Sequence, residues 1–385
     1  MMVLSVVWFI LVAVLWAMYL VLEGFDFGVG MLLRVVGKTP TERTAVVRTI
    51  GPHWDGNEVW LLTAGGAMFA AFPLWYASMF SGMYLALFVV LVLLIVRIAA
   101  LEWRSKVASQ KWRDTWDWFL IAASYGVPLV LGVAFANLVQ GMQIEAQSTA
   151  VVDGSLAVAT IPPADVPAAM GAGNIAFNLT GGFFSLFTPF TLLGGVMLVA
   201  VCLAHGAQFL ALKTEGDIRE RSVKVGATAS LIAAGLAAVW GIWGQLAYSA
   251  NALAWIPLGI AAVALVAAAV LAQPKIQKEG WAFTFSSIGI VAAVAWIFSA
   301  MAPYAMKSTI DPAYSLTIGW ASSTQPTLVI MTVVAAVLVP IVLAYTAWSY
   351  WVFRKRVSVA SVENNAGLLP DKIRPYANFL TGKKV

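Results

Sequence analysis

Long stretches of this sequence contain no charged side chain, and that feature limits the folds that the chain can adopt. No charge occurs before Glu23, and none occurs from Val59 to Val96. Because a helix needs about 20 apolar residues to cross the ~30 Å hydrocarbon core of a bilayer, these stretches are long enough for membrane spans. Charged residues make up only 11% of the 385 residues and hydrophobic residues 61%, which excludes a soluble, disordered or fibrous protein. We therefore expect an all-α polytopic membrane protein.

The charge-free stretches predict nine transmembrane helices. The first runs to about Leu33, and because it has neither a basic region nor a small-residue cleavage site, we expect it to be retained as an anchor. Pro73 and Asn251 mark the points at which two longer stretches divide into pairs of helices. The nine expected helices occupy about residues 3–33, 59–73, 73–96, 119–142, 183–212, 225–251, 251–274, 281–301 and 328–353.

The basic residues give this arrangement an orientation. With nine spans, 22 of the 23 Lys and Arg residues fall on one side of the membrane, and Lys307 lies on the other. Because cytoplasmic loops are enriched in Lys and Arg, we expect the N-terminus outside and the C-terminus in the cytoplasm. The net charge of +5 is then a topology signal and gives no reason to expect nucleic acid as a partner. We expect one transmembrane domain at 1–353, with an irregular, non-catalytic outer loop at 142–182, and a polar cytoplasmic tail at 354–385.

Two acids lie late in the first expected span. At 3.6 residues per turn Glu23, Asp26 and Gly30 share one face, while Gly24 and Gly28 form a small surface suited to close helix contact. Two carboxylates one turn apart repel each other, so we expect at least one to hold a proton near neutral pH. The alternative is that the helix has already crossed ~30 Å by residue 23, which would leave both acids in water at the cytoplasmic interface.

A second polar cluster stands at the cytoplasmic entrance to the second expected span. His53, Asp55, Asn57 and Glu58 lie within six residues, directly before a stretch of 38 residues without charge. The spacing of Asp55 and Glu58 fits a helix capping box, which would explain both acids. Proton uptake from cytoplasmic water would require groups in the same place, so the sequence leaves capping and proton relay open.

The histidine and cysteine supply limits metal chemistry. One cysteine, Cys202, cannot form an intramolecular disulfide, and two histidines cannot build a metal site with several His or Cys ligands. We expect no metal site in this chain. His205 could serve as an axial haem ligand, although a lone histidine in a membrane helix more often packs and forms hydrogen bonds.

The two polar clusters closely resemble motifs of subunit II of the cytochrome bd ubiquinol oxidase family. The matching segments are GFDFGVG at 24–30 and PHWDGNEVW at 52–60. Further similar segments are TAGGA at 63–67, WRDTWDW at 112–118, GVAFAN at 132–137, WAF at 281–283 and VPIVLAYTAW at 339–348. The resemblance therefore covers nearly the whole chain, and the outer loop and the tail look least like the family.

The resemblance implies a role in a terminal respiratory oxidase of the bacterial inner membrane. Such an oxidase oxidises ubiquinol near the outer face and reduces O2 to water with cytoplasmic protons, which generates a proton-motive force. In the family, two b haems, one d haem and the quinol-oxidising loop belong to subunit I. The resemblance therefore implies a haem-free chain, active only with subunit I. It also suggests a structural ubiquinone in this chain, a small single-span third subunit and membrane lipid as partners.

The resemblance also suggests roles for single residues. Asp55 matches an aspartate of the cytoplasmic proton route, and Asp26 matches the acid of the first motif, so both are expected to transfer protons. His53 and Glu58 would support them, and Trp60 matches a tryptophan on a membrane-side O2 route. Two other functions fit the composition: a secondary transporter, which would need polar residues at the bilayer midplane, and a purely structural scaffold.

Overall fold

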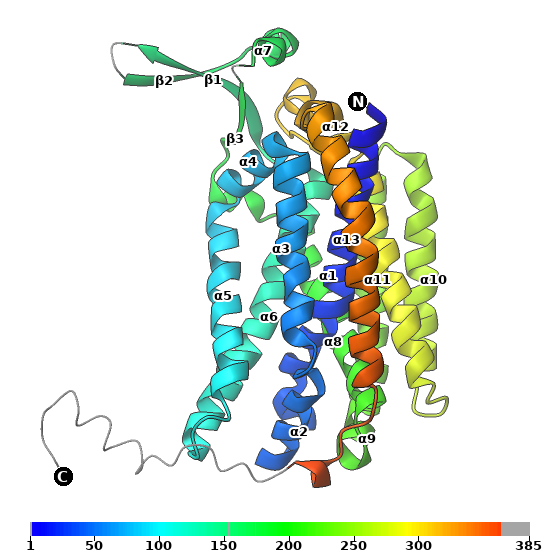
Figure 1. The fold of residues 1–385 in the computed structure, drawn as a ribbon. Coiled ribbons are helices and arrows are strands. Elements are labelled where there is room, and N and C mark those ends of the chain that lie inside the picture. The colour runs from blue at the N-terminus through cyan, green and yellow to red at the C-terminus, as the bar shows by residue number, and fades with distance from the viewer. Residues whose placement is uncertain (1, 153–154, 174, 363–385) are drawn as a thin grey trace, which may run out of the picture.

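The computed structural model describes residues 2–152, 155–173 and 175–362. Most of these residues are helical, and the long helices stand side by side in one upright bundle (Figure 1). Eight helices in this part of the chain are long and apolar enough to cross a bilayer. They are α1 (Met2–Val36), α5 (Tyr84–Trp103), α6 (Gln110–Gln140), α8 (Pro189–Lys213), α9 (Gly216–Tyr248), α10 (Trp255–Leu271), α11 (Glu279–Met301) and α13 (Gln325–Val352). The all-α membrane fold is thereby confirmed for eight of the nine expected spans.

The remaining expected span corresponds to α3 (Trp54–Ala71), which stands in the bundle beside α1 and α13 (Figure 1). It has only 18 residues, and because Asp55, Asn57 and Glu58 lie near its start, it contains no 18-residue window as apolar as those of the other eight. The chain breaks at Phe72, as expected from Pro73, but the second span of this pair begins only at Tyr84. Pro73 instead opens a short helix, α4 (Pro73–Gly82), because proline is accepted in the first turn of a helix.

Helix α1 lies inside the bundle and contacts α3, α6, α8 and α11. The predicted glycine contact is confirmed: a Cβ added to Gly28 would overlap the carbonyl oxygen of Cys202, and a Cβ added to Gly206 of α8 would overlap the Gly28 backbone. At 35 residues, α1 is about 52 Å long, which exceeds the ~30 Å hydrocarbon core of a bilayer.

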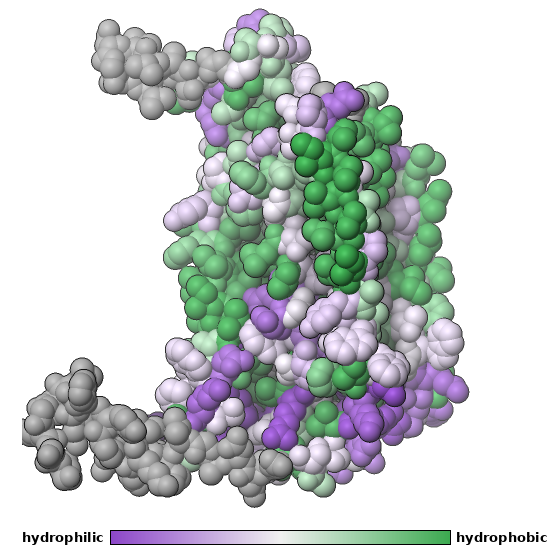
Figure 2. Space-filling view, in the orientation of Figure 1, coloured by the Kyte–Doolittle hydropathy of each residue, from purple (hydrophilic) through white to green (hydrophobic). Residues whose placement is uncertain are grey.

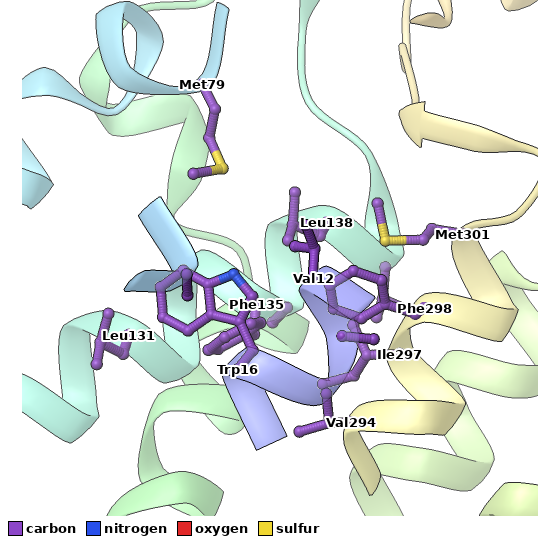
Figure 3. Close-up of a cluster of buried hydrophobic side chains, with 14 of the residues drawn as sticks. Val12, Trp16, Met79, Leu131, Phe135, Leu138, Val294, Ile297, Phe298 and Met301 are labelled. Carbon is purple, nitrogen blue, oxygen red and sulfur yellow. The ribbon is translucent and has the colours of Figure 1, made fainter. Parts of the chain in front are cut away.

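Aromatic and branched side chains fill the core of the bundle around α1. Trp16 of α1 meets Phe135 of α6 edge to face, with ring centroids 5.1 Å apart. Phe298 and Met301 of α11 come from the opposite side of α1 (Figure 3). Burial of this apolar surface fixes α1 between α6 and α11.

Both ends of α1 are tied to neighbouring elements. At its N-terminal end Ser5 Oγ donates to Ser322 Oγ at 2.8 Å, and Trp8 Nε1 donates to Thr332 Oγ1 at 3.0 Å. At its C-terminal end Arg34 pairs with Asp114 at 2.6 Å. The same ionic network joins α2 (Pro40–Ile50) and the end of α5 to α6 through Arg43, Arg104 and Asp117.

The outer segment 142–182 is not the irregular loop that the sequence suggested. Strands β1 (Ile144–Val152), β2 (Ser155–Thr160) and β3 (Ala176–Leu179) form an antiparallel sheet in the order β2-β1-β3, with a short helix α7 (Val166–Ala172) (Figure 1). Its Ala and Gly content suggested a loop, but Val and Thr residues flank an Asp-Gly dipeptide at 153–154, which is typical of a hairpin sequence. The Tyr314 hydroxyl donates to Ile161 O at 2.8 Å and attaches the segment to the bundle.

The remaining elements are short and lie between the long helices. They are α12 (Ile318–Ala321), β4 (Tyr304–Met306) and β5 (Leu316–Thr317), with single 3-10 turns at 163–165, 183–186, 252–254, 312–314 and 359–361. The fifth span begins at Pro189 rather than near Phe183, because Thr188 caps α8 after the turn at 183–186. Figure 2 shows apolar residues over the middle of the bundle and polar residues gathered at its lower end.

Lys307, the exception in the charge distribution, is tied to the ends of three helices. Its ammonium group donates to Val139 O, Tyr248 O and Ala300 O at 2.8–3.4 Å. These carbonyls belong to the last turns of α6, α9 and α11, where the helix dipole favours a cation. Of the tail, residues 354–362 pack against the C-terminal end of α8: Val357 N donates to Lys213 O at 2.7 Å. Residues 363–385 lie outside the described residues.

Candidate functional site

Four ionisable side chains from three helices meet inside the bundle. Glu23 and Asp26 come from α1, Glu58 from α3 and Arg97 from α5. The Arg97 guanidinium forms an ion pair with Glu23 and lies 3.7 Å from Oε2 of Glu58. It also lies over the ring of Phe27, 4.7 Å from the centroid. We call Glu23, Asp26, Glu58 and Arg97 the acid–arginine cluster.

The cluster is buried in protein. Glu23, Asp26 and Arg97 have no exposed surface, and the Glu58 side chain is 13% exposed. The expected shared face of Glu23 and Asp26 is confirmed, but the alternative that water surrounds both acids is wrong. Helix α1 continues past them to Val36, and its neighbours enclose both carboxyl groups.

The charge balance of the cluster favours a stored proton. Three carboxyl groups face one guanidinium, so the cluster would carry two uncompensated negative charges if all three were ionised. Moving an ion out of water costs several kcal/mol even after relaxation of the protein. We therefore expect at least one of the three carboxyl groups to hold a proton at neutral pH, as the sequence predicted.

Arg97 is the functional residue that sequence reasoning missed. The charge count assigned it to a cytoplasmic loop at 97–117, whereas the structure places it inside α5, which continues to Trp103. A signal was present, because apolar residues follow Arg97 as far as Leu101 and because an intramembrane arginine needs an acidic partner. Arg97 therefore belongs to the cluster and does not contribute to the cytoplasmic loop charge.

The second motif is divided between the surface and the core. Asp55 is exposed on the first turn of α3, and Glu58, one turn further along, reaches towards Arg97. The capping alternative is wrong, because His53 occupies the N-cap of α3 and the described residues there form no side-chain cap hydrogen bond. Trp60 is 5% exposed and packs in the apolar core.

Asn57 and Tyr350 connect the cluster to the end of α13. Asn57 Nδ2 donates to Asp26 Oδ2 at 2.7 Å, and the Tyr350 hydroxyl donates to Asn57 Oδ1 at 2.8 Å. The ring of His53 stacks on the ring of Tyr350 with centroids 4.2 Å apart and planes 4° from parallel. Burial and the nearby Lys213 ammonium lower the pKa of His53 to about 4, so its imidazole is neutral at physiological pH. The structure thus brings His53, Asn57 and Asp26 together.

His205 holds three helices together by both ring nitrogens. Its Nδ1 lies 2.6 Å from Ser286 Oγ of α11, and its Nε2 lies 3.1 Å from Val21 O of α1. A carbonyl oxygen only accepts, so Nε2 donates and the neutral ring accepts from Ser286. Both nitrogens are engaged, which favours the packing role over haem ligation. Among the described residues, no three His, Cys, Asp or Glu side chains are placed to hold a metal ion.

These features define a class: multi-pass helical membrane proteins that bury a charged cluster between their helices. The family model of cytochrome bd terminal oxidase subunit II matches residues 4–353, and the chain belongs to this family. It is therefore a multi-pass protein of the bacterial inner membrane and a subunit of an oxidoreductase complex. Because the chain belongs to this family, we set aside the secondary-transporter alternative.

Curated relatives extend over almost the entire chain. Cytochrome bd-I ubiquinol oxidase subunit 2 of Escherichia coli is 38% identical over 94% of this chain and 97% of its own length. Cytochrome bd ubiquinol oxidase subunit 2 of Bacillus subtilis is 38% identical over 91% of this chain and 96% of its own length. A chain from the structure of bd oxidase from Geobacillus thermodenitrificans covers 91% of this chain and 98% of its own length with a TM-score of 0.67 and 13% identity, which shows the shared fold.

Proposed function

We propose that this chain is the haem-free subunit II of a quinol oxidase that oxidises ubiquinol and reduces O2 to water. The names of the Escherichia coli and Bacillus subtilis relatives support ubiquinol as the electron donor. The two b haems and the d haem would belong to subunit I, because both ring nitrogens of His205 are engaged and His53 lies buried against Tyr350. The complex would take its protons from the cytoplasm and generate a proton-motive force, with a small third subunit and membrane lipid as further partners.

We further propose that the chain has nine spans, of which α3 is the second. The N-terminus would lie outside and the C-terminus in the cytoplasm. The 18 residues of α3 would extend ~27 Å, close to the ~30 Å of a hydrocarbon core. The ionic network of Arg34, Arg43 and Arg104 lies at the end of the bundle that would face the cytoplasm, and Lys307 lies at the other. Residues 1–353 would form one transmembrane domain and residues 354–385 a cytoplasmic tail.

We propose that the acid–arginine cluster is part of the proton route, and its burial beside an exposed acid carries this proposal. Asp55 would collect protons from water, and Glu58 on the next turn of α3 would pass them to the carboxyl groups around Arg97. Asp26 would hold a proton at the inner end of the cluster, with His53 in support. For O2, we propose passage beside Trp60, whose surroundings are apolar.

A structural ubiquinone would need an apolar cavity, and one lies between α3, α4 and α5. Its volume is about 510 Å³, and its walls include Leu61, Gly65, Phe69 and Phe88. Side chains of this kind suit an isoprenoid tail, and the Tyr76 and Tyr84 side chains also line the cavity. We propose this cavity as the place of the tail.

The proton role of Asp55 can be tested in the assembled oxidase. Asp55→Asn removes the exposed acid with little change in volume, and quinol-driven O2 consumption should fall by a factor of about 10 or more while haem absorbance is kept. Asp217→Asn, at an exposed acid in the first turn of α9, is the matched control and should keep full activity. Full activity of Asp55→Asn would remove the proposal, and loss of haem absorbance would support the scaffold alternative.

A further inference from the structure

We propose that Tyr350 is a positioning residue for proton transfer, which acts on Asp26 through the side chain of Asn57. The observation is the hydrogen-bond series from the Tyr350 hydroxyl through the Asn57 amide to the Asp26 carboxyl group, at 2.8 Å and 2.7 Å. Tyr350 lies 293 positions from Asn57 along the chain, near the end of α13. The inference rests on the proposed proton role of Asp26.

Chemistry fixes the direction of each hydrogen bond in this series. Asn57 Nδ2 also lies 3.4 Å from the carbonyl oxygen of Leu22, which can only accept. The amide nitrogen therefore faces α1, and Oδ1 faces away from it and accepts from the Tyr350 hydroxyl. Tyr350 thus fixes the amide in the orientation that donates to Asp26, and this donation stabilises the ionised carboxylate.

The end of α13 is itself held in place on several sides. The ring of His53 stacks on that of Tyr350, and Phe25 of α1 meets Tyr350 edge to face with centroids 6.4 Å apart. A few residues further along the chain, the Lys213 ammonium donates to the carbonyl oxygen of Phe353 and, at 3.0 Å, to that of Lys355. Because these contacts hold the phenol in place, its hydroxyl can act on Asn57 without sampling other rotamers.

Other charged and titratable groups also surround Asp26, so a test must separate them from the series. They are Glu23 of α1, Glu58 of α3, Arg97 of α5 and Tyr350 of α13, while Tyr19 of α1 and Cys202 of α8 interact with Glu23. Of these, Tyr350 alone bonds to Asn57 among the described residues. A variant pair in Tyr350 and Asn57 therefore isolates the series from the direct effects of the other groups.

The experiment is a double-variant cycle in the purified, assembled oxidase, with O2 consumption measured against pH. Asn57→Ala should move the midpoint of the profile by about half a pH unit or more, and Tyr350→Phe by less in the same direction. The double variant should move it no further than Asn57→Ala alone. Tyr345→Phe removes a hydroxyl from a 66% exposed position on α13 and should leave the profile unchanged.

A full Tyr350→Phe shift in the Asn57→Ala background, or no shift in Tyr350→Phe, would overturn the inference. If Asn57→Ala fails to assemble, infrared difference spectra of Tyr350→Phe decide: the carboxyl band that Asp26→Asn removes should change frequency, and an unchanged band overturns the inference. Full activity of Asp26→Asn with an unaltered profile would instead overturn the proton role of Asp26. The two failures are therefore distinguishable.

Discussion

At the scale of the residue, Arg97 supplies the positive charge of the acid–arginine cluster. It is fully buried and lies within ion-pair distance of two carboxyl groups. Buried ion pairs contribute little net stability, yet removal of one partner leaves an unpaired charge that costs about 3–5 kcal/mol. Because the cluster adds little net stability and its disruption is costly, we infer that it is kept for a function and not for the stability of the fold.

We predict that Arg97→Gln destabilises the complex and that Glu23→Gln compensates for it. The single variant leaves the acids of the cluster unpaired, so thermal unfolding of the purified oxidase should occur at a clearly lower temperature. In the double variant one carboxylate fewer remains to be balanced, and much of the loss should be recovered. Arg354→Gln, at an exposed arginine over Trp351, is the control. Equal unfolding temperatures for Arg97→Gln and the control would contradict the prediction.

At the scale of the element, the crossing of α1 and α8 sets the position of Glu23 and Asp26. Gly28 and Gly206 allow the two backbones to approach each other closely. A Cβ added to Gly24 would lie 3.6 Å from Cys202 Sγ, which is ordinary contact. Without Cβ atoms at the crossing, α8 can approach the same stretch of α1 that carries the acids. The helix contact and the site therefore depend on the same turns of α1.

We predict that Gly28→Ala disturbs the site through this crossing. The added Cβ would overlap the carbonyl oxygen of Cys202, so α8 must move away from α1 at a cost of about 1–3 kcal/mol or more. The yield of haem-containing complex and its O2 consumption should both fall. Gly235→Ala on α9 meets nothing within 4 Å and should behave as wild type. Normal activity of Gly28→Ala would show that the crossing tolerates a wider separation.

At the scale of the whole molecule, local sequence patterns predicted the helices but did not predict contacts between residues far apart in the sequence. Charge-free stretches located the long helices, and the 3.6-residue period placed Glu23 and Asp26 on one face. Arg97 and Tyr350 were missed because their roles come from partners on other helices, more than 30 residues away in sequence. The sheet at 144–179 was missed because its Ala- and Gly-rich composition is typical of a loop, although the Asp-Gly dipeptide at 153–154 is typical of a hairpin.

We predict that the chain produced without its partner shows no Soret band in reduced-minus-oxidised spectra. Both ring nitrogens of His205 are engaged in hydrogen bonds, so it has no free lone pair for iron. The intact complex, purified through a tag on this chain, is the positive control and should yield a haem-rich partner. A b-type spectrum that His205→Ala abolishes would contradict the prediction and return haem ligation to this chain.

Helix α1 is one unbroken helix, fastened at Ser5 and Trp8 on one side and at Arg34 on the other. The binding sites of many secondary transporters are formed by broken helices, whereas α1 is unbroken beside Glu23 and Asp26. Because α1 is held at both ends, we expect the acid–arginine cluster to keep its place in the bundle. Protons would then have to reach the cluster by transfer between side chains and water molecules, without a movement of the surrounding helices.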